Sequence, residues 1–591
     1  MIILGVWDGT PSSAALIVDG KILIALSEER ISRTKNAYGF PKNSIKNILK
    51  QTGYSLADID EVAMSTASLS PTYFYTSRNA TFSIKDYWKE QKEYWYKKFY
   101  EGKDPKYLEI FSDKINYADF PYDQSLIKNE KDSSGMWKAR KKHLSESLGI
   151  DQEKISLHDH HTCHACYGYL MSPYREKDSL IFTMDGNGDN TNGTISKAKF
   201  GEPLTFVSRS SNFNLGRIYR YATLLLGMRP ADHEYKVMGL AAYNSEKYGK
   251  EAYEIYKETL EVDGLTFRYK NKVKDHFFYF KEKLEGQRFD AIAYGLQRFT
   301  EEILTDWINN GIEHTGINNI IMSGGVAQNI KANKCISELD NLDQLFIPPG
   351  PGDESICIGA AWLQFLKKGG DIKDIPIQTN GYFGPSFTSN EIGSELKKLD
   401  LNQFTIKEVE AKDVAKLLAN SEVVARFGKE PMEFGARALG NRSILADPRK
   451  QETINYINKL VKMRDFWMPF APSILEERQD DYIVNPKKID SRYMAIGFDS
   501  TPLAREHLSA GLHPFDKTMR PQVVTAKDNL GYHSLIKEFE KITGVGALLN
   551  TSFNIHGEPI VGSPSDAIDT LRRCGLKHLY IGDFLVSKKS I

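Results

Sequence analysis

Four glycine turns, each following a short apolar run, constrain the fold of this chain more than any other feature. They are Asp8-Gly9, Asp185-Gly186-Asn187-Gly188, Ser323-Gly324-Gly325 and Gly350-Pro351-Gly352-Asp353. The apolar runs predict strands, and helix-length segments lie between them. Strands that end in glycine turns and alternate with helices indicate an α/β chain, with a nucleotide cleft at the carboxyl edge of a sheet.

The length of the chain allows more than one such domain. Its 591 residues suffice for two to four domains with sizeable cores. Residues 367–386 are rich in Gly, Pro and Asn and form the best candidate linker. We therefore expect one α/β domain over residues 1–378 and a second over residues 379–591. Near the start of the first, Asp19-Gly20 lies between two apolar runs and predicts a β-hairpin.

Residues 79–145 differ in composition from the rest of the first domain. They are rich in Lys, Glu, Tyr, Trp and Phe and contain few small residues. We interpret them as amphipathic helices inserted into the domain. Aromatic residues such as Trp88, Tyr94, Trp95 and Tyr96 either anchor the insertion to the core or form one wall of an acceptor pocket. The mixed signs of charge disfavour a third interpretation, stacking on nucleic acid.

Composition excludes several classes of protein. Lys plus Arg and Asp plus Glu each number 77, so the formal net charge is zero and a general nucleic-acid coat is excluded. No apolar stretch is long enough for a transmembrane helix, and the first ten residues lack the basic region of a signal peptide. Five cysteines do not make a disulfide framework. We expect a cytoplasmic enzyme that binds neither nucleic acid nor membrane.

A dense histidine cluster, LHDHHTCHACYGY, supplies candidate metal ligands. His160 and His164 are four residues apart, so on a helix they share one face at a separation of about 6 Å. That spacing suits two imidazole ligands of one metal ion. Cys163 and Cys166 form a C-x-x-C that has neither a following histidine nor a second such pair. We therefore expect them to be buried cysteines, not haem or zinc ligands.

The acids in two of the glycine turns extend this candidate site. Asp185 and Asp353 could complete an octahedral site with the two histidines. Mixed nitrogen and oxygen ligands favour iron(II) or manganese over a closed zinc site. Glycine also lets backbone amides approach phosphate oxygens. The combination predicts a metal ion beside a nucleotide cleft.

A set of cations and amides in the C-terminal part predicts an anion site. Residues 426–449, RFGKEPMEFGARALGNRSILADPR, are dense in Arg and Gly, and arginine forks bind phosphate or carboxylate oxygens in pairs. Lys462 and Arg464, on a strand, would point to one face, and Asn550 and Ser552 would do the same. Arg520 lies in a further basic string, TMR. The alternative is a set of surface salt bridges.

These motifs, taken together, resemble the ATP-dependent O-carbamoyltransferases of the nodulation-protein NodU and tobramycin carbamoyltransferase type. The resemblance covers nearly the whole chain. It rests on EERISRTK, DHHTCHACYGY, MDGNGDNTNG, HEYKVMGLAAY, MSGGVAQN, PGDESICIGAA, FGARALGNRSILADPR, KMRDFWMPFAPSIL, TMRPQVV and LLNTSFNIHGEPIV.

The resemblance implies a fold and a reaction for each domain. The N-terminal domain is expected to be a threonylcarbamoyl-transferase-like member of the actin/sugar-kinase superfamily, and the C-terminal domain to be YrdC-like. The C-terminal domain would form carbamoyl-adenylate from carbamoyl phosphate and ATP. The N-terminal domain would pass the carbamoyl group to a hydroxyl of a small molecule or sugar. ATP with Mg²⁺ and an Fe²⁺ ion are the implied cofactors, and a homodimer is a possible assembly.

The resemblance also assigns roles to individual residues. The metal ligands would be His160, His164, Asp185 and Asp353. The residues expected to bind the nucleotide are Gly186, Gly188, Gly324, Gly325, Asn329, Arg437 and Arg442. The residues expected to bind carbamoyl phosphate and ATP and to act in catalysis are Lys462, Arg464, Arg520, Asn550 and Ser552.

Two positions depart from the family pattern. Thr10, followed by Pro11, stands where many members carry His, and Met468 stands where many carry Arg. The change at Thr10 leaves open which group deprotonates the acceptor. The change at Met468 means that one phosphate contact is missing or is supplied by another residue. Two other functions are compatible with parts of the sequence. They are a threonylcarbamoyladenosine-type tRNA modification enzyme and a non-catalytic, nucleotide-gated interaction protein.

Overall fold

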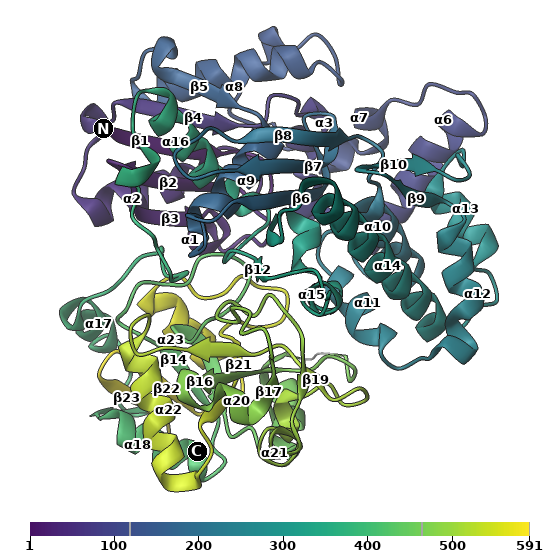
Figure 1. The fold of residues 1–591 in the computed structure, drawn as a ribbon. Helices are drawn as coiled ribbons and strands as arrows, with labels where there is room; N and C mark the ends of the chain where they lie inside the picture. Colours follow the sequence, from purple (N-terminus) through teal and green to yellow (C-terminus); the bar gives the residue numbers. More distant parts are fainter. Residues whose placement is uncertain (118–119, 463–464, 590–591) are drawn as a thin grey trace. The chain divides into compact units, whose positions relative to one another are not determined.

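The computed structural model describes residues 1–117, 120–462 and 465–589, and these form two compact units. Unit 1 comprises Met1–Glu29 and Asn36–Ile377, and unit 2 comprises Arg30–Lys35 and the chain from Gln378 onward. Both units combine helices with sheets (Figure 1), so the predicted α/β fold class is confirmed. Among the described residues, no helix has the length and apolar character needed to cross a membrane.

The first sheet of unit 1 has five strands in the order β3-β2-β1-β4-β5. β2 is antiparallel to both β1 and β3, whereas β4 and β5 run parallel to β1. The predicted turn at Asp19-Gly20 joins β2 to β3, which confirms the hairpin. The strands are β1 (Ile2–Trp7), β2 (Ser13–Val18), β3 (Lys21–Ser27), β4 (Glu61–Ser65) and β5 (Ile155–His158).

The second sheet of unit 1 repeats this topology. Its order is β12-β11-β6-β7-β8, with an antiparallel β6-β7-β8 meander and two strands parallel to β6. β6 therefore corresponds to β1, and β11 to β4. The strands are β6 (Ser179–Gly188), β7 (Thr191–Ala198), β8 (Thr205–Ser210), β11 (Asn319–Ser323) and β12 (Gln344–Phe346).

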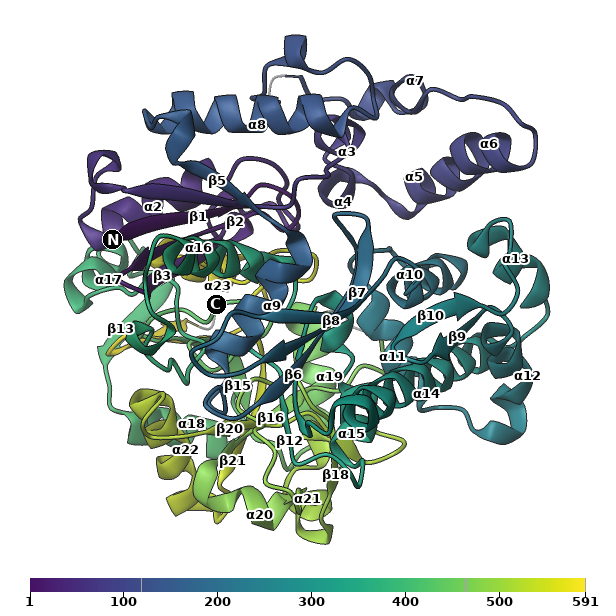
Figure 2. The ribbon, with the colours of Figure 1, turned by 45° about the horizontal axis from the view of Figure 1, so that its top comes forward.

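Two helices lie between the sheets of unit 1 (Figure 2). α16 (Ile356–Lys367) packs on β1, β2 and β4, α9 (His160–Met171) packs on β6, β7 and β11, and the two helices pack on each other. Eleven of the twelve residues of α9 are buried. This burial explains why its sequence lacks a polar face. The outer side of the second sheet carries α10 (Leu215–Leu225), α14 (Phe289–Thr315) and α15 (Ile330–Ser337).

The aromatic-rich segment that follows β4 folds as a series of short helices. They include α5 (Ile84–Lys89), a π-helix (Glu90–Tyr96) and α8 (Ser133–Leu148). Tyr94 is buried in a hydrophobic cluster with Phe277 of α13 (His276–Lys283), and Trp88 and Trp95 pack against this cluster. Tyr96 is 40% exposed and stacks on Tyr100. The rings therefore serve mainly to anchor the segment to the rest of unit 1.

Unit 2 is built on an eight-stranded mixed sheet in the order β13-β23-β22-β14-β15-β21-β16-β20. α22 (Leu530–Thr543) packs on β16 and β21, and α23 (Pro564–Arg573) packs on β22. The strands are β13 (Phe404–Glu408), β14 (Val424–Phe427), β15 (Arg442–Ala446), β16 (Ala471–Leu475), β20 (Gln522–Val524), β21 (Ala547–Ser552), β22 (His578–Ile581) and β23 (Phe584–Lys588). A small sheet contains β17 (Ile483–Val484), β18 (Phe498–Ser500) and β19 (Thr518–Met519).

Candidate active sites

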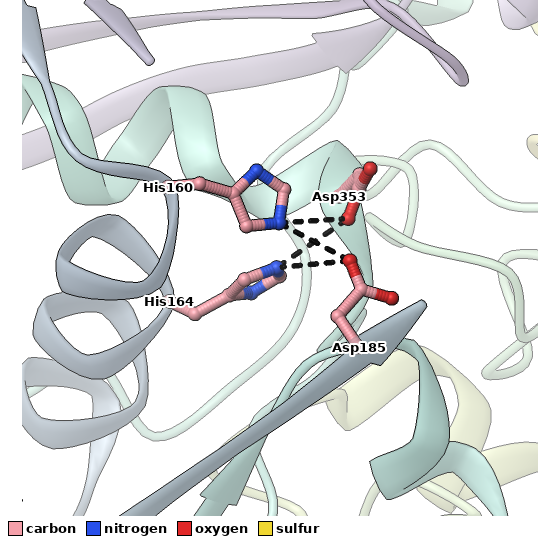
Figure 3. A group of neighbouring side chains, drawn as sticks. All are labelled: His160, His164, Asp185 and Asp353. Carbon is pink, nitrogen blue, oxygen red and sulfur yellow. Dashed lines mark hydrogen bonds and ion pairs between the residues drawn. The ribbon is translucent and has the colours of Figure 1, made fainter. Parts of the chain in front are cut away.

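The four predicted metal ligands meet in unit 1. One ligand atom from each of His160, His164, Asp185 and Asp353 lies within 4.8 Å of the other three (Figure 3). The Nε2 atom of His160 is 3.1 Å from Oδ2 of Asp185 and 3.6 Å from Oδ1 of Asp353. The Nε2 atom of His164 is 4.0 Å and 3.4 Å from the same two oxygens. Two nitrogens and two oxygens thus converge on one point.

Three elements bring these side chains together. Both histidines lie on α9, four residues apart, and therefore share one face of that helix. Asp185 lies near the end of β6, and Asp353 begins the 3₁₀ helix that precedes α16. Asp159 caps α9 by accepting a hydrogen bond from the Thr162 amide at 2.9 Å.

The donor set fits a divalent cation. His164 is fully buried, and its Nε2 atom has no hydrogen-bond partner within the part of the chain that the structure describes. Burial and the neighbouring His160 lower the pKa of His164 well below its usual value, so the ring is the neutral form that binds metals. Burial and the charge of Asp185 raise the pKa of Asp353 well above its usual value. A cation among them would relieve this repulsion between carboxylates.

The predicted turn at Asp185-Gly186-Asn187-Gly188 is wrong: these residues belong to β6, whose pairing with β7 shifts register between Met184 and Gly188, and the chain turns at Asp189-Asn190. The glycines predicted to bind the nucleotide still lie beside the cluster. A Cβ on Gly188 would lie 2.1 Å from Cδ2 of His160, so only glycine allows the end of β6 to approach the ring. Gly324 has a φ of +101°, and a Cβ on it would lie 2.2 Å from the Met184 carbonyl oxygen. A Cβ on Gly325 would lie 2.9 Å from Oδ1 of Asp185, whereas one on Gly186 would meet nothing within 4 Å.

Asn329 lies shortly after Gly324 and Gly325 and stabilises the local backbone. It is the N-cap of α15 and accepts a hydrogen bond from the Ala332 amide at 3.1 Å. Its side-chain amide also exchanges two hydrogen bonds with Gln297, at 3.0 and 3.1 Å. These contacts hold the segment after the Gly324-Gly325 turn.

The acid of the first glycine turn is engaged by the inserted helices. Both oxygens of Asp8 accept hydrogen bonds from the Arg140 guanidinium of α8, at 2.6 to 3.1 Å, and Tyr122 donates a further bond at 2.9 Å. Asp8 and Arg140 are fully buried. Thr10, at the position of the family histidine, donates its hydroxyl to the Asn36 carbonyl oxygen at 3.0 Å. Asp8 therefore differs from Asp185, its counterpart in the second sheet.

A second polar cluster lies in unit 2. The Nζ atom of Lys462 donates to Oγ of Ser552 at 3.1 Å and to Oδ1 of Asn554 at 2.6 Å. Ser552 and Asn550 both belong to β21, two residues apart. Asn550 donates to the Ala438 carbonyl oxygen at 3.1 Å, and its buried Oδ1 atom has no partner among the described residues.

The prediction that Lys462 lies on a strand is wrong. It ends a π-helix, Asn458–Lys462, that continues α19 (Glu452–Ile457). Ile457 and Val461, four residues apart, are buried in the core of unit 2, and this spacing is helical. Arg464, its predicted partner, lies outside the described residues. Met468, half-buried, donates its amide to the Asp465 carbonyl oxygen at 3.1 Å.

The remaining predicted cations of unit 2 lie in different surroundings. Arg442 is fully buried in β15, donates to the backbone oxygens of Gly428 and Asn441 at 2.9 Å, and lies 3.6 Å from the centre of the Phe427 ring. Burial lowers the pKa of Arg442 to about 10. Arg437 and Arg520 are half-buried. The structure thus surrounds Arg442 with core groups.

Comparison with known families identifies the chain. Residues 3–362 match the family profile described as Carbamoyltransferase N-terminus. Residues 415–588 match the profile described as Carbamoyltransferase C-terminus. The chain belongs to the carbamoyltransferase family. The resemblance read from the motifs is confirmed, and the chain is a transferase enzyme of the O-carbamoyltransferase type.

The alignments with individual relatives cover most of the chain. Uncharacterized protein MJ1058 of Methanocaldococcus jannaschii is 36% identical over 465 residues, which cover 74% of this chain and 75% of that protein. Nodulation protein NolNO of Sinorhizobium fredii is 29% identical over 591 residues, which cover 98% of this chain and 79% of that protein. Among solved structures, full-length HypF in its phosphate- and nucleotide-bound form is 12% identical, covers 62% of this chain and 47% of that chain, and has a TM-score of 0.31. That likeness is too low to support a conclusion.

Proposed function

We propose that this carbamoyltransferase works in two steps, one in each unit, and that residues 1–378 and 379–591 are the two catalytic domains. In the C-terminal domain, carbamoyl phosphate, ATP and one water would give carbamoyl-adenylate, pyrophosphate and phosphate. In the N-terminal domain, an acceptor hydroxyl would attack the carbamoyl carbon, form a carbamate ester and release AMP. The observation that carries this proposal is the four-ligand cluster of unit 1, which has an unpartnered, buried histidine nitrogen.

The N-terminal site would hold a divalent metal ion through His160, His164, Asp185 and Asp353. Two nitrogen and two oxygen ligands favour iron(II) or manganese over zinc. When bound, such an ion supplies Lewis-acid chemistry at a phosphate or carbonyl oxygen. Gly186 and Gly188 at the end of β6, with Gly324 and Gly325 after β11, would bring backbone groups close to the adenylate, because the side-chain space beside three of the four is already filled.

The C-terminal site would bind carbamoyl phosphate and ATP, the latter with Mg²⁺. Lys462 is held by Ser552 and Asn554, so its ammonium is oriented before an anion arrives. Arg520 and Arg437 would bind phosphate oxygens, and Arg464 is proposed from the sequence alone. Arg442 would support the site without contacting the phosphates, because its guanidinium donates hydrogen bonds to backbone carbonyl oxygens. Asn550 retains an unpartnered oxygen that could accept from the carbamoyl amide.

Exclusion of water accounts for the burial of these groups. Carbamoyl-adenylate is a reactive mixed anhydride, so hydrolysis competes with transfer unless the intermediate is enclosed. His160, His164, Lys462 and Asn550 are each at most 2% exposed. The acceptor would be a hydroxyl-bearing small molecule or sugar. A threonine hydroxyl is not a base at neutral pH, so Thr10 would not take the acceptor proton.

The direct test is carbamoyl-phosphate-dependent exchange of labelled pyrophosphate into ATP, measured on the full chain without an acceptor. We expect exchange in the wild type and its loss in Lys462→Ala. Lys459→Ala is the matched control, because Lys459 lies on the same π-helix but is exposed. Absence of exchange in the folded wild type, or equal exchange in both variants, would reject the proposed activation site. An interaction protein or a tRNA-modifying enzyme would not show this exchange with carbamoyl phosphate.

A further inference from the structure

The ligand His160 is in contact with a residue that the sequence motifs do not include. The Nδ1 atom of His160 lies 2.9 Å from the hydroxyl of Thr66. Thr66 follows β4 directly and is 1% exposed. For Nε2 of His160 to bind a metal ion it must carry a lone pair, so the ring proton must be on Nδ1 and is donated to Thr66.

The backbone of Thr66 is unusual. Its φ is +68°, in the left-handed region that β-branched residues rarely adopt. Such a conformation costs on the order of 1–3 kcal/mol and persists only where the surroundings enforce it. This conformation places the Thr66 hydroxyl beside the ring of His160, the first residue of α9.

Hydrogen bonds to the backbone on both sides of Thr66 enforce this conformation. The Thr66 amide donates to the His158 carbonyl oxygen at 3.0 Å. The Thr66 carbonyl oxygen accepts from Nη1 of Arg140 at 2.7 Å, and Nη2 of the same guanidinium donates to the Ser65 carbonyl oxygen at 3.2 Å. Asp8 holds Arg140 from the other side. Every polar atom of Thr66 is thereby used, and the chain of contacts runs from the inserted helix α8 to a metal ligand.

The second half of unit 1 contains a corresponding contact. Ser323 is the last residue of β11, the counterpart of β4. Its hydroxyl lies 3.4 Å from Nδ1 of His164 and donates to the Pro351 carbonyl oxygen at 3.3 Å. A hydroxyl at the carboxyl end of each of the two equivalent strands therefore lies near the Nδ1 atom of one histidine. The contact to His160 is the shorter of the two.

We propose that Thr66 is a positioning residue of the metal site, which fixes the orientation and tautomer of His160, and that Arg140 of the inserted helices holds Thr66 in place. Partners of a ligating histidine typically contribute 10–100-fold to metal affinity. The proposal gives the inserted helices a function beyond packing. It rests on the metal site proposed above.

The test is Mn²⁺ affinity, measured on the full-length protein without substrates by the EPR signal of the free ion. Thr66→Val and Thr66→Gly remove the hydroxyl and should raise the Kd for Mn²⁺ by about 10–100-fold. Thr66→Ser keeps the hydroxyl and should stay near the wild-type value. Ser65→Ala is the matched control, because the neighbouring Ser65 hydroxyl is buried without a partner among the described residues.

The melting temperature of the metal-free protein separates positioning from stability. Glycine adopts a φ of +68° without strain, so Thr66→Gly should bind Mn²⁺ weakly while its metal-free melting temperature does not fall. Wild-type affinity in Thr66→Val and Thr66→Gly would overturn the role of Thr66 alone. A loss of affinity that follows a fall in melting temperature in every variant would also overturn it. A folded wild type that binds no Mn²⁺ would overturn the metal site and this inference together.

Discussion

Replacement of Arg140 by methionine tests the network beneath the first glycine turn. Arg140 and Asp8 are both fully buried, and the guanidinium makes contacts of 2.6, 2.9 and 3.1 Å with the carboxylate. In Arg140→Met, the one side-chain partner left to the Asp8 carboxylate within the described residues would be the Tyr122 hydroxyl at 2.9 Å. Removal of one partner from a buried ion pair typically costs about 3–5 kcal/mol, because the other charge is left uncompensated.

The double variant Asp8→Asn/Arg140→Met shows whether charge is the cause. It removes both charges and keeps side chains of similar volume. Its loss of local stability should therefore be at least about 2 kcal/mol smaller than the sum of the losses in the two single variants. The measurement is native-state hydrogen exchange of the peptides that cover β1 and β4, which reports the free energy of local opening. Arg268→Met, which breaks an exposed ion pair with Glu261, is the control and should leave both peptides unchanged. A loss below about 1 kcal/mol in Arg140→Met, or strict additivity in the double variant, would refute this reasoning.

Three further variants test the assignment of roles. His164→Ala removes one of four converging ligands and should lower carbamoyl transfer at least about 100-fold, or about 2.7 kcal/mol, while pyrophosphate exchange persists; equal loss of both activities in a folded protein would contradict this. Arg520→Lys should weaken carbamoyl phosphate use in the exchange assay, because lysine lacks the two-pronged guanidinium, and near-normal kinetics would place Arg520 outside the site. Trp88→Ala should lower the melting temperature and leave the KM for the acceptor unchanged, since Trp88 packs against Phe277; a raised KM at unchanged stability would instead favour the pocket-wall interpretation.

The sequence was most informative where the chain reverses at the end of a strand. The Asp19-Gly20 hairpin and the Gly324-Gly325 turn after β11 follow from local chemistry, since glycine and aspartate tolerate conformations that other residues avoid. The pairing of His160 with His164 follows from helical spacing, and the two acids from their place after apolar runs that predict strands. These features are local, so they can be read without knowledge of the fold.

Contacts between distant segments could not be predicted in this way. The duplicated sheets of unit 1 contain no short sequence repeat, so the correspondence of β4 with β11 appears only in the topology. Asp8 and Arg140 are 132 residues apart, and nothing in either segment specifies the partner. Thr66 lies directly after a fully buried strand, at the carboxyl end of β4, but its left-handed conformation is imposed by tertiary contacts. Lys462 lies on a helix and not on a strand, because burial of Ile457 and Val461 at helical spacing decides the local structure, and the i, i+2 spacing of two cations does not.

Product analysis of a complete reaction tests the central claim most directly. The full chain would be incubated with carbamoyl phosphate, ATP and a panel of small-molecule alcohols and sugars, and nucleotides and acceptors would be quantified by mass spectrometry. Two-step carbamoyl transfer predicts AMP and pyrophosphate in amounts equal to a carbamoylated acceptor. Formation of ADP with a phosphorylated acceptor would contradict it, because the duplicated fold of unit 1 would then act as a kinase.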